Sequence, residues 1–210
     1  MKLQLSHPNL ENQLLLDELH PTLLIVENPH EYYAFVTDLI DELQGVPSRF
    51  SCWEDTERVR GDKVGDVIVD LFNFDVVDKK ITSLLYKKLT KNYFNGAFVA
   101  DFNKINSELQ LFLQNLCSTV DFALDFGEIS LDDVFKACSV KPLRTYQSYL
   151  EKIICYINLL TELKGTYLYV FVGLKDVLND EDLRLLYNHC RLNKVYLLLI
   201  ESSKKTSVAC

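Results

Sequence analysis

The sequence predicts an α/β protein whose head contains a mostly parallel sheet and whose chain carries an inserted, all-helical lobe. Two apolar runs near the C-terminus, YLYVFV (167–172) and VYLLLI (195–200), flank a polar helical stretch, as in a strand–helix–strand unit. A third run, DVIVDLF (66–72), is rich in β-branched residues and suits a buried strand. Between about residues 76 and 164 we find helical periods and no convincing strand.

The N-terminal part of the head begins with short strand candidates. These are residues 2–5, 12–16, 22–28 and 49–53. A helix over 30–44 follows Asn28–Pro29, because Asn caps helices and Pro is preorganised for the first helical position. Gly45 ends that helix.

The C-terminal part of the head should form parallel neighbours. A helix capped by Asn179 connects the two apolar runs, and only a right-handed crossover returns it to the sheet. The run at 167–172 is nearly all apolar, so both of its faces should be covered. We therefore assign residues 1–75 and 165–210 to the head and 76–164 to the lobe. The expected helical segments of the lobe are 76–94, 96–126, 130–138 and 143–163.

Composition indicates a folded, acidic protein. The chain has 210 residues, 48% of them hydrophobic, and a formal net charge of −8, which leaves room for a local basic surface. No apolar run approaches the roughly 20 residues that span a bilayer, and the N-terminus lacks signal-peptide features. The six cysteines include no C-x-x-C pair. We expect a reduced, cytoplasmic protein without a structural zinc and without a membrane partner.

Motifs of catalysis are missing. None of the seven glycines opens a phosphate-binding loop, and GDKVG (61–65) lacks its spacing. Asp70 ends an apolar run like a magnesium ligand, but a strand-end aspartate that meets water is the plainer interpretation. The four histidines accompany no nucleophile signature. We therefore do not expect an enzyme.

A row of lysines marks the first helix of the lobe. Lys80, Lys87 and Lys91 fall within about 40° of one another on a helix. One interpretation is an ordinary solvated face, and the other is a stripe that contacts phosphates without reading bases.

A second group of cations lies in KACSVKPLR. Lys136, Lys141 and Arg144 surround an expected helix end. Cations there complement the helix dipole, and a nucleic-acid contact is the equal alternative.

An acidic segment, DFALDFGEISLDD, precedes this group. It contains Asp121, Asp125, Glu128, Asp132 and Asp133. Calcium prefers several carboxylate oxygens, although the spacing is not that of an EF-hand. Acids at a helix start are the other interpretation, since Ser130 and Asp133 form a variant capping box.

Three blocks together resemble a known family. The stretches VIVDLFNFDVVDKKITSLLYKKL, LDFGEISLDDVFKACSVK and LYVFVGLKDVLNDEDLRLLYNHCRLNKVYLLLIE are similar to the Csn-two family, accessory subunits of subtype II-A CRISPR–Cas systems of bacteria. The resemblance covers most of residues 60–202. It implies a head similar to P-loop ATPases without their phosphate-binding motifs.

The resemblance also implies a function. Family members are non-enzymatic, form homotetrameric rings with a basic inner face, bind calcium, and bind ends of double-stranded DNA without sequence preference during spacer acquisition. Other CRISPR adaptation and effector proteins are implied partners. Lys136 and Lys141 match lysines of the channel, and Asp125 and Glu128 match acidic positions of the calcium segment. Gly127 replaces a further carboxylate, and the tail after Glu201 is shorter than in relatives.

The leading hypothesis is therefore a calcium-dependent, ring-forming clamp on DNA ends. The alternative is a protein-interaction scaffold whose helical lobe docks partner proteins, with DNA binding incidental. A third hypothesis, a cryptic NTPase or nuclease, lacks any supporting motif.

Overall fold

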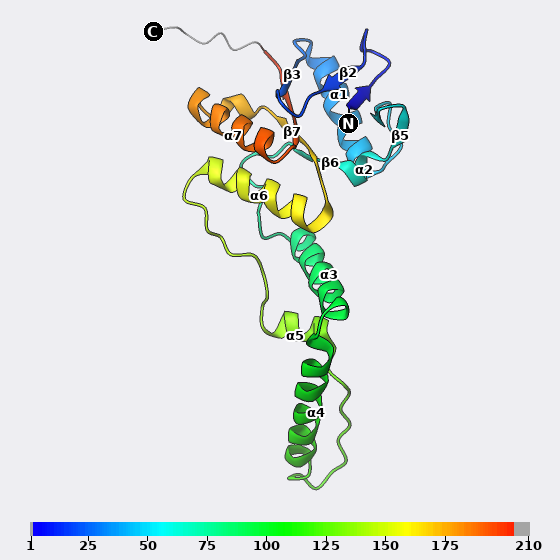
Figure 1. Cartoon of the computed structure of the whole chain (residues 1–210), viewed down its shortest axis with the longest axis vertical. Coiled ribbons are helices and arrows are strands. Elements are labelled where there is room, and N and C mark those ends of the chain that lie inside the picture. Colours follow the sequence, from blue (N-terminus) through cyan, green and yellow to red (C-terminus); the bar gives the residue numbers. More distant parts are fainter. Residues whose placement is uncertain (1, 204–210) are drawn as a thin grey trace. The chain divides into compact units, whose positions relative to one another are not determined.

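The structure is a computed structural model, and it describes residues 2–203. The chain divides into two compact units, Met1–Val76 with Thr145–Cys210, and Val77–Arg144. We call the first unit the head and the second the lobe (Figure 1). Most of the C-terminal tail, from residue 204 on, lies outside the described residues.

A four-stranded parallel sheet forms the centre of the head. Its strands are β3 (Thr22–Ile25), β6 (Gly65–Ile68), β7 (Leu168–Val172) and β8 (Tyr196–Glu201), in the order β3-β8-β7-β6. Leu168 pairs with Tyr196 at the start of the β7–β8 ladder, which confirms the parallel strand–helix–strand unit. The head is therefore the mixed α/β structure that the sequence predicts.

A second, antiparallel sheet contains the remaining short strands. These are β1 (Leu3–Ser6), β2 (Leu14–Leu16), β4 (Ser51–Glu54) and β5 (Glu57–Val59), in the order β2-β1-β4-β5. The strand β5 was not expected, because ERV is short and two of its three residues are charged. It pairs with β4 through a tight turn at Asp55, whose φ is 53°.

The helices of the head begin and end at clear signals. They are α1 (Pro29–Gln44), α2 (Gly61–Val64), α6 (Tyr149–Lys164) and α7 (Asp180–Leu192), with a short 3-10 turn, η1 (Leu174–Asp176). Asn28 caps α1 by accepting the backbone N–H of His30 and Glu31, and Gly45 ends it with φ 77°. Gly165 ends α6 in the same left-handed conformation.

The parallel sheet is covered on both faces. Val170 and Leu198 belong to a core that also contains Leu3 of the antiparallel sheet and Leu39 of α1. On the other face, the hydroxyl of Tyr169 donates to the backbone carbonyl of Ile157 on α6, at 2.9 Å. All residues of β7 and β8 are buried, as expected for strands that read as continuous apolar runs.

The second boundary between head and lobe differs from the expected one. The sequence suggested a return to the head at residue 165, whereas residues from Thr145 on, including α6, belong to the head. A buried hydrogen bond joins α6 to the parallel sheet: the hydroxyl of Tyr156 on α6 donates to Asp66 Oδ2 on β6 at 2.6 Å. The helical period of 143–163 was correct from Tyr149 on, but period alone does not say which unit a helix packs against.

The lobe contains three helices, α3 (Lys79–Asn95), α4 (Phe98–Cys117) and α5 (Leu131–Ala137). The expected helix over 96–126 is wrong after Cys117. The hydroxyls of Ser118 and Thr119 donate to the carbonyls of Asn115 and Leu116, both at 2.7 Å, and these bonds compete with further helix.

Residues 118–130 form a non-helical segment that runs back along α4 (Figure 1), and we call it the return segment. The side-chain amide of Gln110 donates to the carbonyl of Gly127 at 2.8 Å. Asn106 donates to the carbonyl of Ile129 at 3.5 Å. Two amide side chains of α4 therefore hold the segment in place.

No helix among the described residues is both long enough and apolar enough to cross a bilayer.

Candidate nucleic-acid interface

An open groove of about 770 Å³ lies between α3 and α5 in the lobe. The two helices contact through the rings of Tyr86 and Phe135, whose centroids are 5.1 Å apart. Successive turns of one face of α3 line the groove, from Lys79 to Phe94. Aromatic packing thus holds α5 beside α3, and the groove runs along α3.

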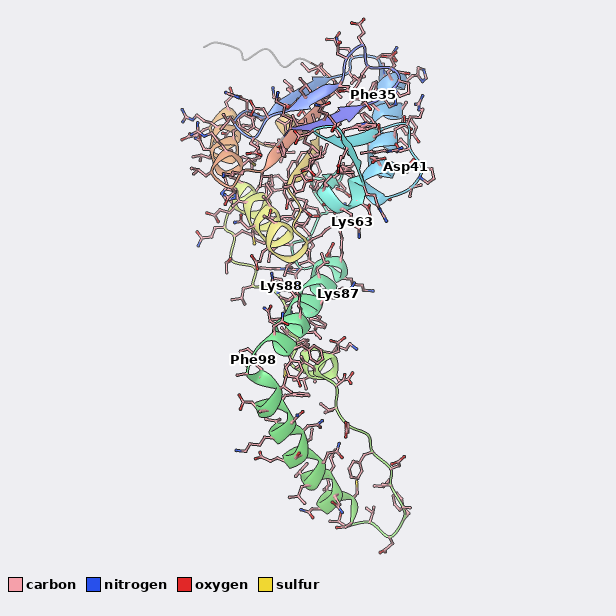
Figure 2. The ribbon with its side chains drawn as sticks, turned by 45° about the vertical axis from the view of Figure 1, so that its right-hand side comes forward. Phe35, Asp41, Lys63, Lys87, Lys88 and Phe98 are labelled. Atoms are coloured by element: carbon pink, nitrogen blue, oxygen red, sulfur yellow. The ribbon has the colours of Figure 1, made fainter. Side chains whose placement is uncertain are left out.

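Lysines border this groove from both helices. Lys79, Lys87 and Lys91 come from α3, and Lys136 comes from the last turn of α5. All four are exposed, and Figure 2 labels Lys87 on α3. We call Lys79, Lys87, Lys91 and Lys136 the groove lysines. Part of each cation group noted in the sequence therefore lies in the same groove: Lys87 and Lys91 from the first group, and Lys136 from the second.

The other candidate cations lie outside the groove lining. Lys80 is exposed on α3, and Lys141 and Arg144 are exposed in the segment that follows α5. Lys79 was not selected from the sequence, because it lies about 100° from Lys80 on the helix and so falls off the stripe. It also lies about 80° from Lys87, so helix spacing alone did not mark it as a residue of the groove.

Carboxylates also border the groove. Asp78 caps α3 by accepting the N–H of Ile81 at 2.7 Å, and Asp132 lies in the first turn of α5. Lys136 Nζ is 3.8 Å from Asp133 Oδ1, with both side chains more than half exposed, so this ion pair holds the lysine only weakly. Most of the positive charge in the groove remains accessible to an anion.

Charge is distributed unevenly in the chain. The lobe contains nine Lys and Arg against eight Asp and Glu, a net charge of +1, whereas the head carries 13 against 22, a net charge of −9. Within the lobe, α3 contains five lysines and no acid, whereas residues 98–133 contain one lysine and seven acids. The acidic average of the chain thus conceals a basic helix.

The predicted calcium ligands lie on two neighbouring elements. Asp121, Asp125 and Glu128 are exposed on the return segment, and Asp132 and Asp133 occupy the first turn of α5. Among residues 2–203, no three His, Cys, Asp or Glu side chains are gathered as metal ligands. The calcium site stays a prediction.

Asp133 is engaged in the capping box that the sequence predicted. Its Oδ2 accepts the hydroxyl of Ser130 at 2.5 Å, and its backbone N–H donates back to Ser130 Oγ at 3.2 Å. The hydrogen bond from the Ser130 side chain, followed by that from the Ser130 backbone, lowers the pKa of Asp133. This carboxylate therefore already stabilises the start of α5.

Asp70 lies at a turn after β6. Its carboxylate accepts the side-chain amide of Asn73 at 2.8 Å and the backbone N–H groups of Asn73 and Phe72. These bonds, led by that from the Asn73 side chain, lower the pKa of Asp70. A turn-stabilising role accounts for this strand-end aspartate.

Two cysteines and one histidine of the head have structural surroundings. Cys52 and Cys190 are buried, and burial raises the pKa of each thiol to about 12. His189 bonds to Asn158 Oδ1 at 2.9 Å, and burial lowers its pKa. The described cysteines are free thiols.

Comparison with known proteins defines the class of this α/β protein with its inserted lobe. Residues 50–210 match the family model described as CRISPR-associated protein (Cas_Csn2), so the chain is a CRISPR-associated protein. It belongs to the Csn2 family, as the resemblance indicated. Membership implies a role in type II-A CRISPR adaptation, and the family is generally non-catalytic. No curated protein matches the chain.

Proposed function

We propose that this protein is a non-enzymatic, calcium-dependent, ring-forming homotetramer that binds ends of double-stranded DNA without sequence specificity during spacer acquisition. The observation that supports DNA binding most directly is the groove between α3 and α5, with its four exposed lysines. Family membership supplies the adaptation context.

Lysines are suited to sequence-independent binding. Each presents a compact charge on a flexible stem, so it follows phosphates without the planar geometry that reads base edges. Lys87, Lys91 and Lys136 would contact the backbone from two helices, and Lys80, Lys141 and Arg144 would extend the contact beyond the groove. Sequence information plays no part in such binding.

A ring reconciles DNA binding with an acidic chain. If each copy turns its basic helix toward a shared channel, DNA meets a local positive potential there, although the chain is acidic on average. Entry into a closed ring requires an end, so linear duplexes should bind and closed circles of the same sequence should not.

Calcium would act at the acidic part of the lobe. Asp121, Asp125 and Glu128 supply the hard oxygen ligands that calcium prefers, and Asp132 and Asp133 lie next to them in sequence. Binding there would reduce the repulsion of DNA by these carboxylates.

Charge reversal tests the proposal. Lys136→Glu combined with Lys141→Glu should weaken binding of a linear duplex on the order of 100-fold at moderate salt, because each lost charge also removes counterion release. The matched control is Lys104→Glu, an exposed lysine of α4 outside the groove. Equal binding by the double variant and the wild type would contradict the proposal.

A protein-interaction scaffold is the second candidate. The observation that favours it is the apolar surface of the lobe, which holds ten of the 19 exposed large hydrophobic side chains of the described residues. Partners would be other CRISPR adaptation and effector proteins. Under this candidate, the Lys136→Glu and Lys141→Glu variant keeps its protein complexes, and its DNA affinity does not change.

A further inference from the structure

A second pocket, of about 380 Å³, opens in the head. It lies where the end of α1, the strand β5 and the start of α2 come together, and Figure 1 labels all three elements on the same side of the head. Its lining includes the apolar side chains of Val46, Pro47 and Val59. The pocket belongs entirely to one compact unit of the chain, so its geometry does not depend on the lobe.

Glu42 of α1 brings a buried carboxylate to this pocket. Glu42 is only 8% exposed, yet it is one of the lining residues. Its Oε1 accepts the backbone N–H of Gly61 at 3.3 Å. A side chain at position 61 is excluded, because a Cβ there would lie 2.6 Å from the carbonyl oxygen of Glu42. The first glycine of GDKVG therefore allows α2 to approach Glu42 closely.

Glu42 has no cationic partner within the described part of the chain. Among residues 2–203, it forms no ion pair with a Lys, Arg or His side chain. The thiol of Cys52 is a hydrogen-bonding neighbour, and burial, followed by the charge of Glu42, raises the pKa of that thiol to about 12. A neutral thiol does not balance the charge. Because buried carboxylates in proteins are normally paired, a cation that enters the pocket would be stabilised there.

The two arginines of the pocket are in different situations. Arg60 forms a bidentate ion pair with Asp62, through its Nε at 2.9 Å and its Nη2 at 2.8 Å. Arg58 is exposed, and it forms no ion pair with any residue that the structure describes. Its charge lies in water and is screened there. An acidic group would therefore meet Arg58 outside the pocket, whereas a basic group would meet Glu42 inside it.

The pocket adjoins the open edge of a sheet. In the order β2-β1-β4-β5, the strand β5 comes last, so one side of it faces no other strand of the described chain. Glu54 pairs with Glu57 around a two-residue turn, and Trp53 pairs with Arg58. Backbone groups alternate in direction along such a ladder, so the N–H and C=O of Arg58 point to the open side. An extended peptide binds an edge of this kind by adding a strand.

We propose that this edge of the head docks an extended segment of a partner protein, and that the segment inserts one arginine or lysine side chain into the pocket. The segment pairs with β5, the aliphatic stem of its basic residue packs against the apolar walls, and the charged group meets Glu42. The next residue of the segment points to the opposite face, beside Arg58, where an acidic side chain fits. The inference stands apart from the proposed function, since it needs neither DNA nor calcium.

A short peptide of this pattern tests the proposal. The probe is an acetylated and amidated pentapeptide, threonine–valine–arginine–glutamate–threonine. In the control peptide, citrulline replaces arginine, which keeps the shape of the side chain and removes its charge. Trp53 is the single tryptophan of the chain and pairs with Arg58, so its fluorescence reports binding at β5. The arginine peptide should bind at least about 10-fold more tightly than the citrulline peptide, because hydrogen bonds between charged groups are stronger.

Substitution of Glu42 tests the role of the buried charge. Glu42→Gln keeps an acceptor for the N–H of Gly61 and removes the charge, so the preference for arginine over citrulline should fall to less than about 2-fold. The matched control is Asp41→Asn, at the neighbouring carboxylate of α1, which Figure 2 labels and which does not line the pocket. This variant should keep the full preference.

The stability of the peptide-free protein gives an independent measurement. Because an unpaired buried charge costs free energy, Glu42→Gln should not lower the midpoint of urea unfolding. If Arg58 instead turns inward and neutralises Glu42, then Glu42→Gln and Arg58→Gln should both lower the midpoint, and this result overturns the inference. Equal binding of the two peptides, or binding of neither, overturns it as well. Binding of linear DNA is measured separately, so the proposed function stands or falls without these results.

Discussion

His7 and Asp38 join the N-terminal segment to α1 through a hydrogen bond of 3.0 Å between His7 Nε2 and Asp38 Oδ2. His7 is 5% exposed, and its ring lies between the rings of Phe35 and Phe50, with centroids 4.4 and 4.6 Å away. His7 Nδ1 accepts the backbone N–H of Asn9, so Nε2 carries the proton and donates to Asp38. Arg49 Nη2 approaches the same carboxylate oxygen at 2.7 Å.

Removal of this carboxylate should destabilise the head. Burial acts to raise the pKa of Asp38, but hydrogen bonds from Arg49 and His7 outweigh it, and the pKa lies below its usual value. Asp38→Ala leaves a buried N–H of His7 without an acceptor, so we expect a loss of about 1–3 kcal/mol at neutral pH. Chemical denaturation followed by fluorescence measures it.

The pH dependence of this variant follows from the direction of the shift. A lowered pKa adds stability above the usual aspartate value of about 4, and that contribution disappears as pH falls through the folded pKa. The stability difference between wild type and Asp38→Ala should therefore shrink below pH of about 4. A difference that stays constant down to pH of about 2 would contradict this assignment.

The bond between Tyr156 and Asp66 should be one of the stronger links between α6 and the parallel sheet. Both residues are buried, and the oxygens are 2.6 Å apart. Tyr156→Phe removes the hydroxyl and keeps the ring, which packs against Phe74 at 5.4 Å. We expect a loss of about 1–3 kcal/mol in urea unfolding. Tyr33→Phe, at a side chain 73% exposed on α1, should be neutral. Equal stability of both variants would show that the bond contributes nothing.

The groove lysines should determine the salt dependence of DNA binding. Lys87→Ala combined with Lys91→Ala removes two of them, and each lost phosphate contact should reduce the slope of log K against log salt by about 0.9. Filter binding of a linear duplex over a salt series measures the slope. Lys104→Ala, in which the exposed lysine of α4 is lost, should leave it unchanged. An unaltered slope in the double variant would show that residues other than Lys87 and Lys91 contact the DNA phosphates.

Calcium binding should depend on the return segment. Asp125→Asn combined with Glu128→Gln removes two candidate ligands, so calcium affinity in isothermal titration should fall by about 10-fold or more. Asp101→Asn, at an exposed acid near the start of α4, serves as the control. If the double variant binds calcium like the wild type, the ligands are other residues.

The sequence predicted most elements of the head for simple physical reasons. The runs that became β7 and β8 are apolar throughout, and Asn28 and Gly45 mark the ends of α1 within one residue. Family and fold class were both recognised correctly. The strand β5 and the separation into two sheets were missed, because short polar strands depend on their partners more than on their own pattern.

Long-range packing accounts for the other differences. The surroundings of α6 are decided by Tyr156 and Asp66, which are 90 residues apart in the chain. The end of α4 is decided by local hydroxyl bonds at Ser118 and Thr119, which hydrophobic periodicity does not record. For the candidate site, helix spacing identified Lys87 and Lys91. Lys136 lies in the same groove because the rings of Tyr86 and Phe135 pack together. The residue pattern of a single helix does not predict such a contact between two helices.

The lobe is inserted between two strands that are direct neighbours, since β6 and β7 pair in parallel from Gly65 with Leu168 to Ile68 with Phe171. The pairing of these strands therefore does not depend on the length of the lobe, provided that α6 follows it. A lobe of another length or another charge could then be accommodated without a change in the fold of the head. Replacing residues 77–144 with the lobe of another family member should likewise leave the parallel sheet intact.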